Sequence, residues 1–281
     1  MPLPIADSVP SLRAQIALWK KAGDTVALVP TMGALHEGHL ALVRRAKAVC
    51  AKAVVSIFVN PTQFGPNEDY GRYPRQEAKD AELLASAGAD LLYLPPVEAM
   101  YPRGFSTTIT VDGVSKGLCG DFRPIHFAGV ATVVAKLLLQ GGPDRALFGE
   151  KDYQQLQVIK RLVIDLDIPV AIEGVPTVRE ADGLAMSSRN AYLSPAERAI
   201  AARLNVILGE VAGRAKGGEW PAQAAQWGRA ELEKAGFTKI DYLEIRDAES
   251  LVALERLDRP ARVLAAAWLG KTRLIDNRAV G

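Results

Sequence analysis

The sequence predicts an α/β fold class: a parallel sheet wound by helices, with a second, smaller α+β domain. Short apolar runs alternate with helical patterns over roughly the first 185 residues, which favours parallel strands joined by crossover helices. Beyond Arg189 the pattern changes to two helical stretches followed by three strand-like runs. We therefore expect a Rossmann-like domain over residues 1–185 and a small α+β lid domain over residues 186–281.

The composition favours a folded protein from a reducing compartment. Of the 281 residues, 49% are hydrophobic and 23% are charged, which is ample for a core. The net charge of +2 and the lack of a lysine- or arginine-rich block argue against a nucleic-acid partner. Cys50 and Cys119 fit no metal or redox spacing. No apolar run is long enough to span a membrane, and the first residues lack a secretory signal, so we expect a cytoplasmic protein without a membrane partner.

The first strand–loop–helix unit contains the strongest functional pattern. Residues 26–30 predict a buried strand, residues 31–38 a loop with two glycines, and a helical pattern begins at His39. Such a helix start presents backbone N–H groups and the positive end of the helix dipole, which favour a bound anion. His36 and His39 lie three residues apart and can reach one ligand. The alternative is that such a histidine only caps the helix or is a satisfied surface group.

Apolar periodicity, glycines and prolines predict the other elements of the first domain. Helices are expected at 11–21, 76–87, 130–139 and 153–166. Strands are expected at 53–59, 91–94, 107–111, 146–148 and 170–172. Residues 60–65 form a turn-rich loop at the end of a strand, where open parallel sheets bind ligands.

The second domain begins with a helix-capping pattern. Ser194 precedes Pro195, and Glu197 follows at the third helical position, which predicts a helix start. The expected helical stretches are residues 195–216 and 221–235. The expected strands are residues 239–245, 261–268 and 272–276, the last two joined in a hairpin across Gly270 and Lys271.

Two further motifs carry polar chemistry. In Gly149-Glu150-Lys151-Asp152, the lysine suits a phosphate, the aspartate suits ribose hydroxyls, and the glycine permits close backbone approach. Met186-Ser187-Ser188-Arg189 supplies two hydroxyls and a guanidinium within four residues. The alternatives are a solvated helix start capped by Asp152 and an ordinary polar loop.

These motifs together resemble those of known enzymes. His36-Glu37-Gly38-His39 resembles the His-x-Gly-His motif of the nucleotidyltransferase superfamily, and Met186–Arg189 resembles its second, phosphate-gripping loop. Over nearly all of the N-terminal two-thirds, the chain resembles the pantoate–β-alanine ligase family. The matching segments are residues 30–39, 58–64, 124–130, 148–156, 175–180 and 183–190.

The resemblance implies an AMP-forming ligase that joins pantoate to β-alanine through a pantoyl-adenylate intermediate, giving pantothenate. The catalytic residues that it implies are His39, His36, Lys151 and Arg189. The ATP-binding residues that it implies are Pro30, Thr31, Met32, Gly33, His36, Gly38, His39, Gly149, Lys151, Asp152, Val178, Met186, Ser187, Ser188 and Arg189. The substrate-binding residues that it implies are Gln63 and Gln155 for pantoate, Asn60 near the β-alanine site, and His126.

The resemblance also implies Mg²⁺ and a homodimer. It breaks at Asp80, the metal candidate, because relatives can carry consecutive carboxylates there, whereas Lys79 and Ala81 flank Asp80. Two alternatives remain open. The chain could be another adenylyltransferase of the superfamily, although Gln63 and Gln155 suit an acceptor without phosphate better than arginine or lysine would. It could also be a nucleic-acid-binding module derived from a synthetase fold, which its near-neutral charge disfavours.

Overall fold

The computed structural model describes residues 3–66 and 68–281, which form two compact units. The first unit contains the chain up to Val111 together with Arg123–Glu150 and Val158–Pro176. The second unit consists of the segments Asp112–Phe122, Lys151–Gln157 and Thr177–Gly281. The domains at residues 1–185 and 186–281 stay a prediction.

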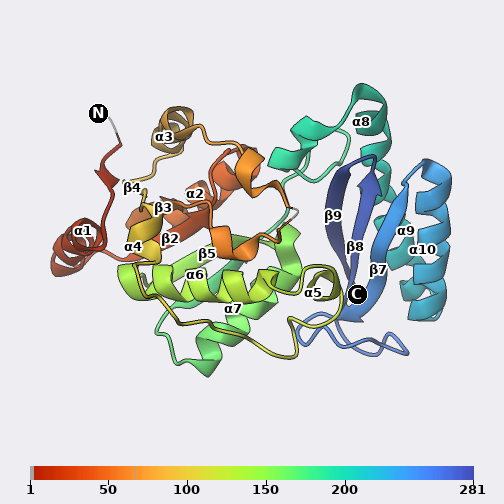
Figure 1. Ribbon diagram of the computed structural model, residues 1–281. Coiled ribbons are helices and arrows are strands. Elements are labelled where there is room, and N and C mark those ends of the chain that lie inside the picture. Colours follow the sequence, from red (N-terminus) through yellow and green to blue (C-terminus); the bar gives the residue numbers. More distant parts are fainter. Residues whose placement is uncertain (1–2, 67) are drawn as a thin grey trace. The chain divides into compact units, whose positions relative to one another are not determined.

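The first unit is built on a six-stranded sheet in which every paired strand is parallel (Figure 1). In spatial order the strands are β1 (Ile5–Ala6), β4 (Leu91–Tyr93), β3 (Lys52–Ile57), β2 (Val26–Thr31), β5 (Arg145–Gly149) and β6 (Ala171–Val175). The predicted parallel sheet is confirmed. The order reverses between β2 and β5, and ligands of open α/β sheets bind beside the carboxyl ends of such strands.

Helices cover both faces of this sheet. Their bounds are α1 Val9–Lys21, α2 Glu37–Val49, α3 Glu77–Ser86, α4 Val97–Met100 and α6 His126–Gly141, with short turns η1 Pro61–Gln63 and η2 Asp69–Arg72; α7, Tyr153–Asp165, spans both units. Val29 of β2 shares one apolar cluster with Val43 of α2 and Leu84 of α3. Helices α1 and α6 lie side by side on the opposite face (Figure 1). The apolar strands are therefore buried from both sides, which explains their continuous apolar runs.

Three predictions for this unit are wrong. Residues 107–111 form no strand; the amide of Ile109 instead donates to Thr132 Oγ1 on α6 over 2.9 Å. Helix α6 begins at His126 rather than at residue 130, and α2 begins at Glu37 rather than at His39. The two-residue strand β1 was too short for its periodicity to be detected.

The second unit pairs a three-stranded antiparallel sheet with helices. Its sheet has the order β7 (Lys239–Asp247), β8 (Ala261–Leu269) and β9 (Thr272–Val280). Its helices and turns are α5 Cys119–Phe122, η4 Ser188–Tyr192, α8 Pro195–Ala201, α9 Arg203–Lys216 and α10 Pro221–Ala235, while η3, Glu150–Asp152, begins in the first unit. The β8–β9 hairpin and the Ser194–Glu197 capping box are confirmed. The expected helix over residues 195–216 is two helices that meet at Ala202.

Ile207 of α9 packs with Leu243 of β7 and Val263 of β8 in the core of the second unit.

Cys50 and Cys119 are buried thiols that form no disulfide. Within residues 3–66 and 68–281, no helix combines the length and the apolar character that a membrane crossing requires.

Candidate functional site

Two histidines cap the helix that follows the central strand. His36 is the N-cap of α2, and its Nδ1 accepts a hydrogen bond from the Gly38 amide over 3.1 Å. His39, at the third helical position, returns the contact, because its Nδ1 accepts from the His36 amide over 3.3 Å. The pair forms a capping box made of imidazoles, in which His36 rather than His39 occupies the cap. Sequence reasoning missed this start because histidine is not among the usual capping residues.

The capping box determines the tautomer of both rings. A ring nitrogen that accepts a hydrogen bond carries no proton, so the proton of each neutral ring lies on Nε2. The ring centroids are 4.1 Å apart and the planes are tilted by 44°. His36 and His39 therefore carry two neighbouring Nε2–H donors at the positive end of α2, an arrangement that suits an anion.

Asp80 fixes the loop that leads to these histidines. Its side chain, on α3, is 2% exposed, and its two oxygens accept from the amides of Ala34 and Leu35, each over 2.9 Å. Ala34 has a φ of 51° and Gly33 a φ of 82°, so two consecutive residues adopt the left-handed region. The carboxylate satisfies two N–H groups that this unusual loop would otherwise bury without a partner.

The surroundings of Asp80 do not fit a protein-bound metal ion. Both of its oxygens are already used by backbone amides. Across the part of the chain that the structure describes, no three or more His, Cys, Asp or Glu side chains are grouped so that they could hold a metal ion. In the structure, both Asp80 oxygens hold the backbone of the loop that leads to the histidines.

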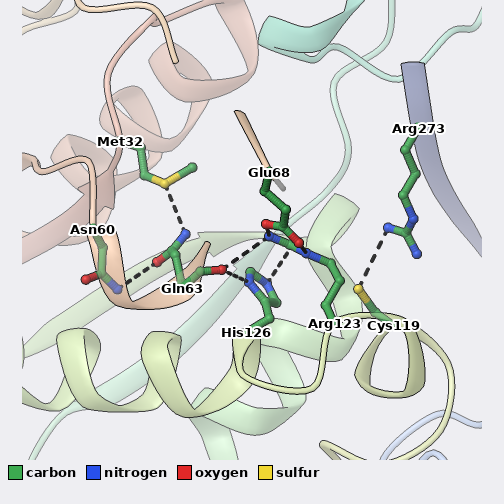
Figure 2. Close-up of polar contacts among 8 residues, drawn as sticks. All are labelled: Met32, Asn60, Gln63, Glu68, Cys119, Arg123, His126 and Arg273. Carbon is green, nitrogen blue, oxygen red and sulfur yellow. Dashed lines mark hydrogen bonds and ion pairs between the residues drawn. The ribbon is translucent and has the colours of Figure 1, made fainter. Parts of the chain in front are cut away.

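Gln63 and Asn60 form a buried amide pair where β3 ends (Figure 2). The Asn60 Nδ2 donates to Gln63 Oε1 over 3.0 Å and to the Gly129 carbonyl over 3.1 Å. The Tyr101 hydroxyl donates to Asn60 Oδ1 over 2.7 Å, which fixes the orientation of the Asn60 amide. The Gln63 Nε2 in turn donates to Met32 Sδ over 3.0 Å, a weak acceptor that a polar ligand can replace.

A charged cluster holds the backbone of Gln63 (Figure 2). Arg123 pairs with both oxygens of Glu68, at 2.8 and 2.5 Å, and its Nη2 also donates to the Gln63 carbonyl over 3.3 Å. His126 Nδ1 lies 3.1 Å from the same carbonyl, so it donates, and Nε2 accepts from Arg123 Nη1 over 3.3 Å. Burial raises the pKa of Glu68, but the hydrogen bond and charge of Arg123 outweigh it and hold the pKa below its usual value. In this arrangement the His126 side chain holds the Gln63 backbone by a hydrogen bond to its carbonyl oxygen.

The carboxyl ends of neighbouring strands bring the predicted residues of the first unit together. Pro30 and Thr31 end β2, and the histidine loop follows directly. Asn60 and Gln63 follow β3, and Gly149 ends β5. Because β2 pairs with both β3 and β5, these segments share one edge of the sheet.

The predicted residues of the second unit lie in two segments. Lys151 and Asp152 belong to the η3 turn, and Gln155 is half-buried on the first turn of α7. The second segment is a hairpin over residues 178–186, in which the Met186 amide donates to the Val178 carbonyl over 3.0 Å. Beyond it, Ser187 caps η4, which contains Ser188 and Arg189.

Polar side chains that sequence reasoning gave no role support this hairpin. The Asn190 Nδ2 donates to Glu180 Oε1 over 2.9 Å and to the Ala185 carbonyl over 3.1 Å. Arg198 pairs with Glu180 and with Asp182. Glu180 and Asn190 lie within segments of the family resemblance, which was the available signal, whereas Arg198 on α8 has none.

Comparisons with known proteins agree with these motifs. The sequence profile of the family described as Pantoate-beta-alanine ligase matches residues 4–279. A pantothenate synthetase from Paramagnetospirillum magneticum is 62% identical over 276 residues, covering 98% of this chain and 97% of that protein. The pantothenate synthetase of Rhodospirillum rubrum is 60% identical, covering 99% of both chains.

Solved structures show the same similarity. The crystal structure of pantothenate synthetase from Thermus thermophilus has a TM-score of 0.93 and 48% identity, covering 99% of each chain. A pantoate-beta-alanine ligase from Francisella tularensis, crystallised with beta-gamma ATP and beta-alanine, has a TM-score of 0.83 and 36% identity, covering 98% of this chain and 97% of that chain. The His36–His39 and Met186–Arg189 motifs are both present, and the family profile matches residues 4–279. The chain therefore belongs to the pantoate–β-alanine ligase family.

Proposed function

We propose that this protein condenses (R)-pantoate with β-alanine at the expense of ATP, giving pantothenate, AMP and pyrophosphate through a pantoyl-adenylate intermediate. Family membership over residues 4–279 supports the reaction, and the Francisella relative was crystallised with an ATP compound and beta-alanine. The observation that carries the proposal is the pair of Nε2–H donors that His36 and His39 hold at the start of α2.

In the first step, a pantoate carboxylate oxygen attacks the α-phosphorus of ATP, and the bond to pyrophosphate breaks. Catalysis of such a transfer is mainly positioning and neutralisation of charge. We assign His39 to the pyrophosphate whose charge increases, because it donates at the positive end of α2. We assign His36, beside it, to the same pyrophosphate. The remaining phosphate-binding roles go to Lys151, Ser187, Ser188 and Arg189, and contacts with ribose or adenine to Gly149, Asp152 and Val178.

In the second step, the amine of β-alanine attacks the activated carbonyl carbon, and the bond to AMP breaks as the amide forms. Gln63 and Gln155 are assigned to pantoate, since uncharged amides suit its hydroxyl and carboxylate groups. Asn60 is assigned to the neighbourhood of β-alanine. His126 supports Gln63 through its backbone carbonyl, so its contribution to substrate binding is indirect.

Magnesium enters this scheme with ATP, as the MgATP substrate. Mg²⁺ commonly keeps several waters and binds through substrate phosphates, so the scheme needs no group of protein carboxylates. A homodimer and a cytoplasmic location complete the proposal; the homodimer rests on family resemblance, and the location on the composition of the chain.

The reaction order can be tested without the second substrate. Enzyme incubated with ATP, Mg²⁺ and pantoate should release about one equivalent of pyrophosphate per active site and retain a bound adenylate. Adding β-alanine should then release AMP and pantothenate. Label from ATP that remains on the denatured protein chain would contradict the proposal, because the scheme contains no covalent enzyme intermediate.

A further inference from the structure

Two consecutive polar residues near the end of the chain are buried within the second unit. Asp276 and Asn277 lie in β9 and are 3% and 4% exposed. Successive strand residues point to opposite faces of a sheet, so the two side chains serve different neighbours. A buried carboxylate is costly unless it is paired, so its partner indicates what it does.

The partner of Asp276 is Arg179, in the hairpin over residues 178–186. Arg179 donates to both oxygens of Asp276, over 2.7 and 3.0 Å, in a two-pronged ion pair whose carboxylate is almost fully buried. The same guanidinium donates to the Gly183 carbonyl over 3.1 Å, and Arg179 pairs with Ala185 across the hairpin. Strand β9 also packs against η4, the turn that contains Ser188 and Arg189.

The partner of Asn277 is the backbone of Lys151. The Asn277 Nδ2 donates to the Lys151 carbonyl over 2.9 Å. The Asn277 amide donates to Asp276 Oδ1 over 2.7 Å, so the two neighbours also hold each other. Two neighbouring residues of β9 (Figure 1) therefore hold both segments of the second unit to which phosphate contacts were assigned, at Lys151 and at Met186–Arg189.

We infer that Asp276 and Asn277 are positioning residues, which hold Lys151 and the Met186–Arg189 loop in one fixed arrangement for the transfer from ATP. The inference rests on the proposed function. Neither residue touches substrate; each acts through the segment that it holds. Misplacing groups that stabilise a transition state lowers the rate of the chemical step more than it weakens binding of the remaining substrates.

The test compares Asp276→Asn and Asn277→Ala with a matched control in the same sheet. Asp241→Asn removes a comparable buried carboxylate, whose hydrogen-bond and ion-pair partners Arg273, Lys239 and Trp268 lie outside both phosphate-binding segments. Pyrophosphate release is measured with ATP and pantoate, together with KM for each substrate and the melting temperature. We expect both test variants to slow pyrophosphate release at least ~10-fold, with KM for pantoate and β-alanine within about 3-fold. The control should lower the melting temperature but keep the rate.

If Asp276→Asn does not fold, Arg179→Lys provides the same test, because lysine cannot form the two-pronged pair. Normal pyrophosphate release in the folded Asn277→Ala variant and in whichever of Asp276→Asn and Arg179→Lys folds would overturn the inference. So would an equal loss in Asp241→Asn, which would show a merely structural effect. A wild-type enzyme that releases no pyrophosphate with pantoate would instead refute the proposed function, so the two failures are distinguishable.

Discussion

Adding one methyl group at Gly129 should impair the reaction with pantoate much more than it lowers the stability of the fold. It lies in the first turns of α6, against the η1 segment that carries Gln63. A Cβ at this position would lie 2.5 Å from the Thr62 carbonyl oxygen and 2.7 Å from Gln63 Cα. Both neighbours are backbone atoms, so no side chain can rotate to relieve the clash, and the Thr62–Gln63 segment must move.

The expected displacement follows from these distances. Non-bonded carbon and oxygen atoms need about 3.4 Å, so the segment has to shift by roughly 1 Å. A shift of that size at a substrate-positioning group can cost ~100-fold in rate. In stability, overpacking costs about 1–3 kcal/mol, but alanine also gains about 1 kcal/mol over glycine inside a helix. The two stability terms leave a net cost of roughly 0–2 kcal/mol, below the ~2.7 kcal/mol to which a ~100-fold rate loss corresponds, so the main effect of Gly129→Ala should be kinetic.

The assay measures KM and kcat for pantoate and for ATP, with urea unfolding alongside. Gly129→Ala should lower kcat/KM for pantoate by ~10- to 100-fold, with a small loss of stability. Gly141→Ala is the matched control on the same helix, since its added Cβ would lie 3.6 Å from Ile16 Cδ1, in ordinary contact. The control should show unchanged kinetics. If Gly129→Ala retains wild-type kcat/KM for pantoate, then either Gln63 does not bind pantoate or the contact with α6 does not position it.

Three further predictions concern the first unit. His39→Asn should unfold at nearly the wild-type urea concentration, because its amide oxygen can still accept from the His36 amide, while turnover falls ~100-fold or more; wild-type turnover would reduce His39 to a cap. The pKa of Glu68 is lowered in the folded state, so its stabilisation is complete above its unfolded pKa of about 4.3 and is lost as pH falls through the lower folded value. The gap in urea midpoint between wild type and Glu68→Gln should thus close toward acidic pH, and a constant gap would contradict the charge argument. Asp80→Asn should destabilise the fold by about 1–3 kcal/mol, because its NH₂ group cannot accept the hydrogen bond of the backbone amide that it faces, without changing the Mg²⁺ concentration that gives half-maximal activity; a raised Mg²⁺ requirement would favour a metal role.

Local patterns predicted most of the fold, and the failures have particular causes. Helix α10 has the expected bounds, because Pro221 opens it and Gly236 follows it. The apolar pattern predicts a helix from residue 130, whereas α6 begins four residues earlier, at His126, and includes Gly129. The structure shows instead that Gly129 lies inside the helix because only glycine permits its approach to Thr62. The β-branched residues at 107–111 favour a strand, but no strand of the sheet pairs with them.

The supporting contacts of the site were beyond local patterns because they join distant parts of the chain. Asp80 holds an amide 46 residues away, Arg123 pairs with Glu68 55 residues away, and Arg179 pairs with Asp276 97 residues away. A lone aspartate in a helix or strand carries no periodic or capping signal that names such a partner. The strand–loop–helix motif around His36 and His39 could be recognised because its strand, loop and helix start are contiguous in the sequence.

Both units nevertheless use the same physical device. In the first, the buried carboxylate of Asp80 holds the left-handed loop before His36; in the second, the buried carboxylate of Asp276 holds Arg179 and its hairpin. A loop carrying groups for a highly charged substrate must keep its shape before the substrate arrives, since reordering it during the reaction would add to the barrier. Glycine and polar residues in these loops do not provide that stiffness. A buried acceptor on a regular element does, so replacing the carboxylate should loosen the loop while its motif residues remain unchanged.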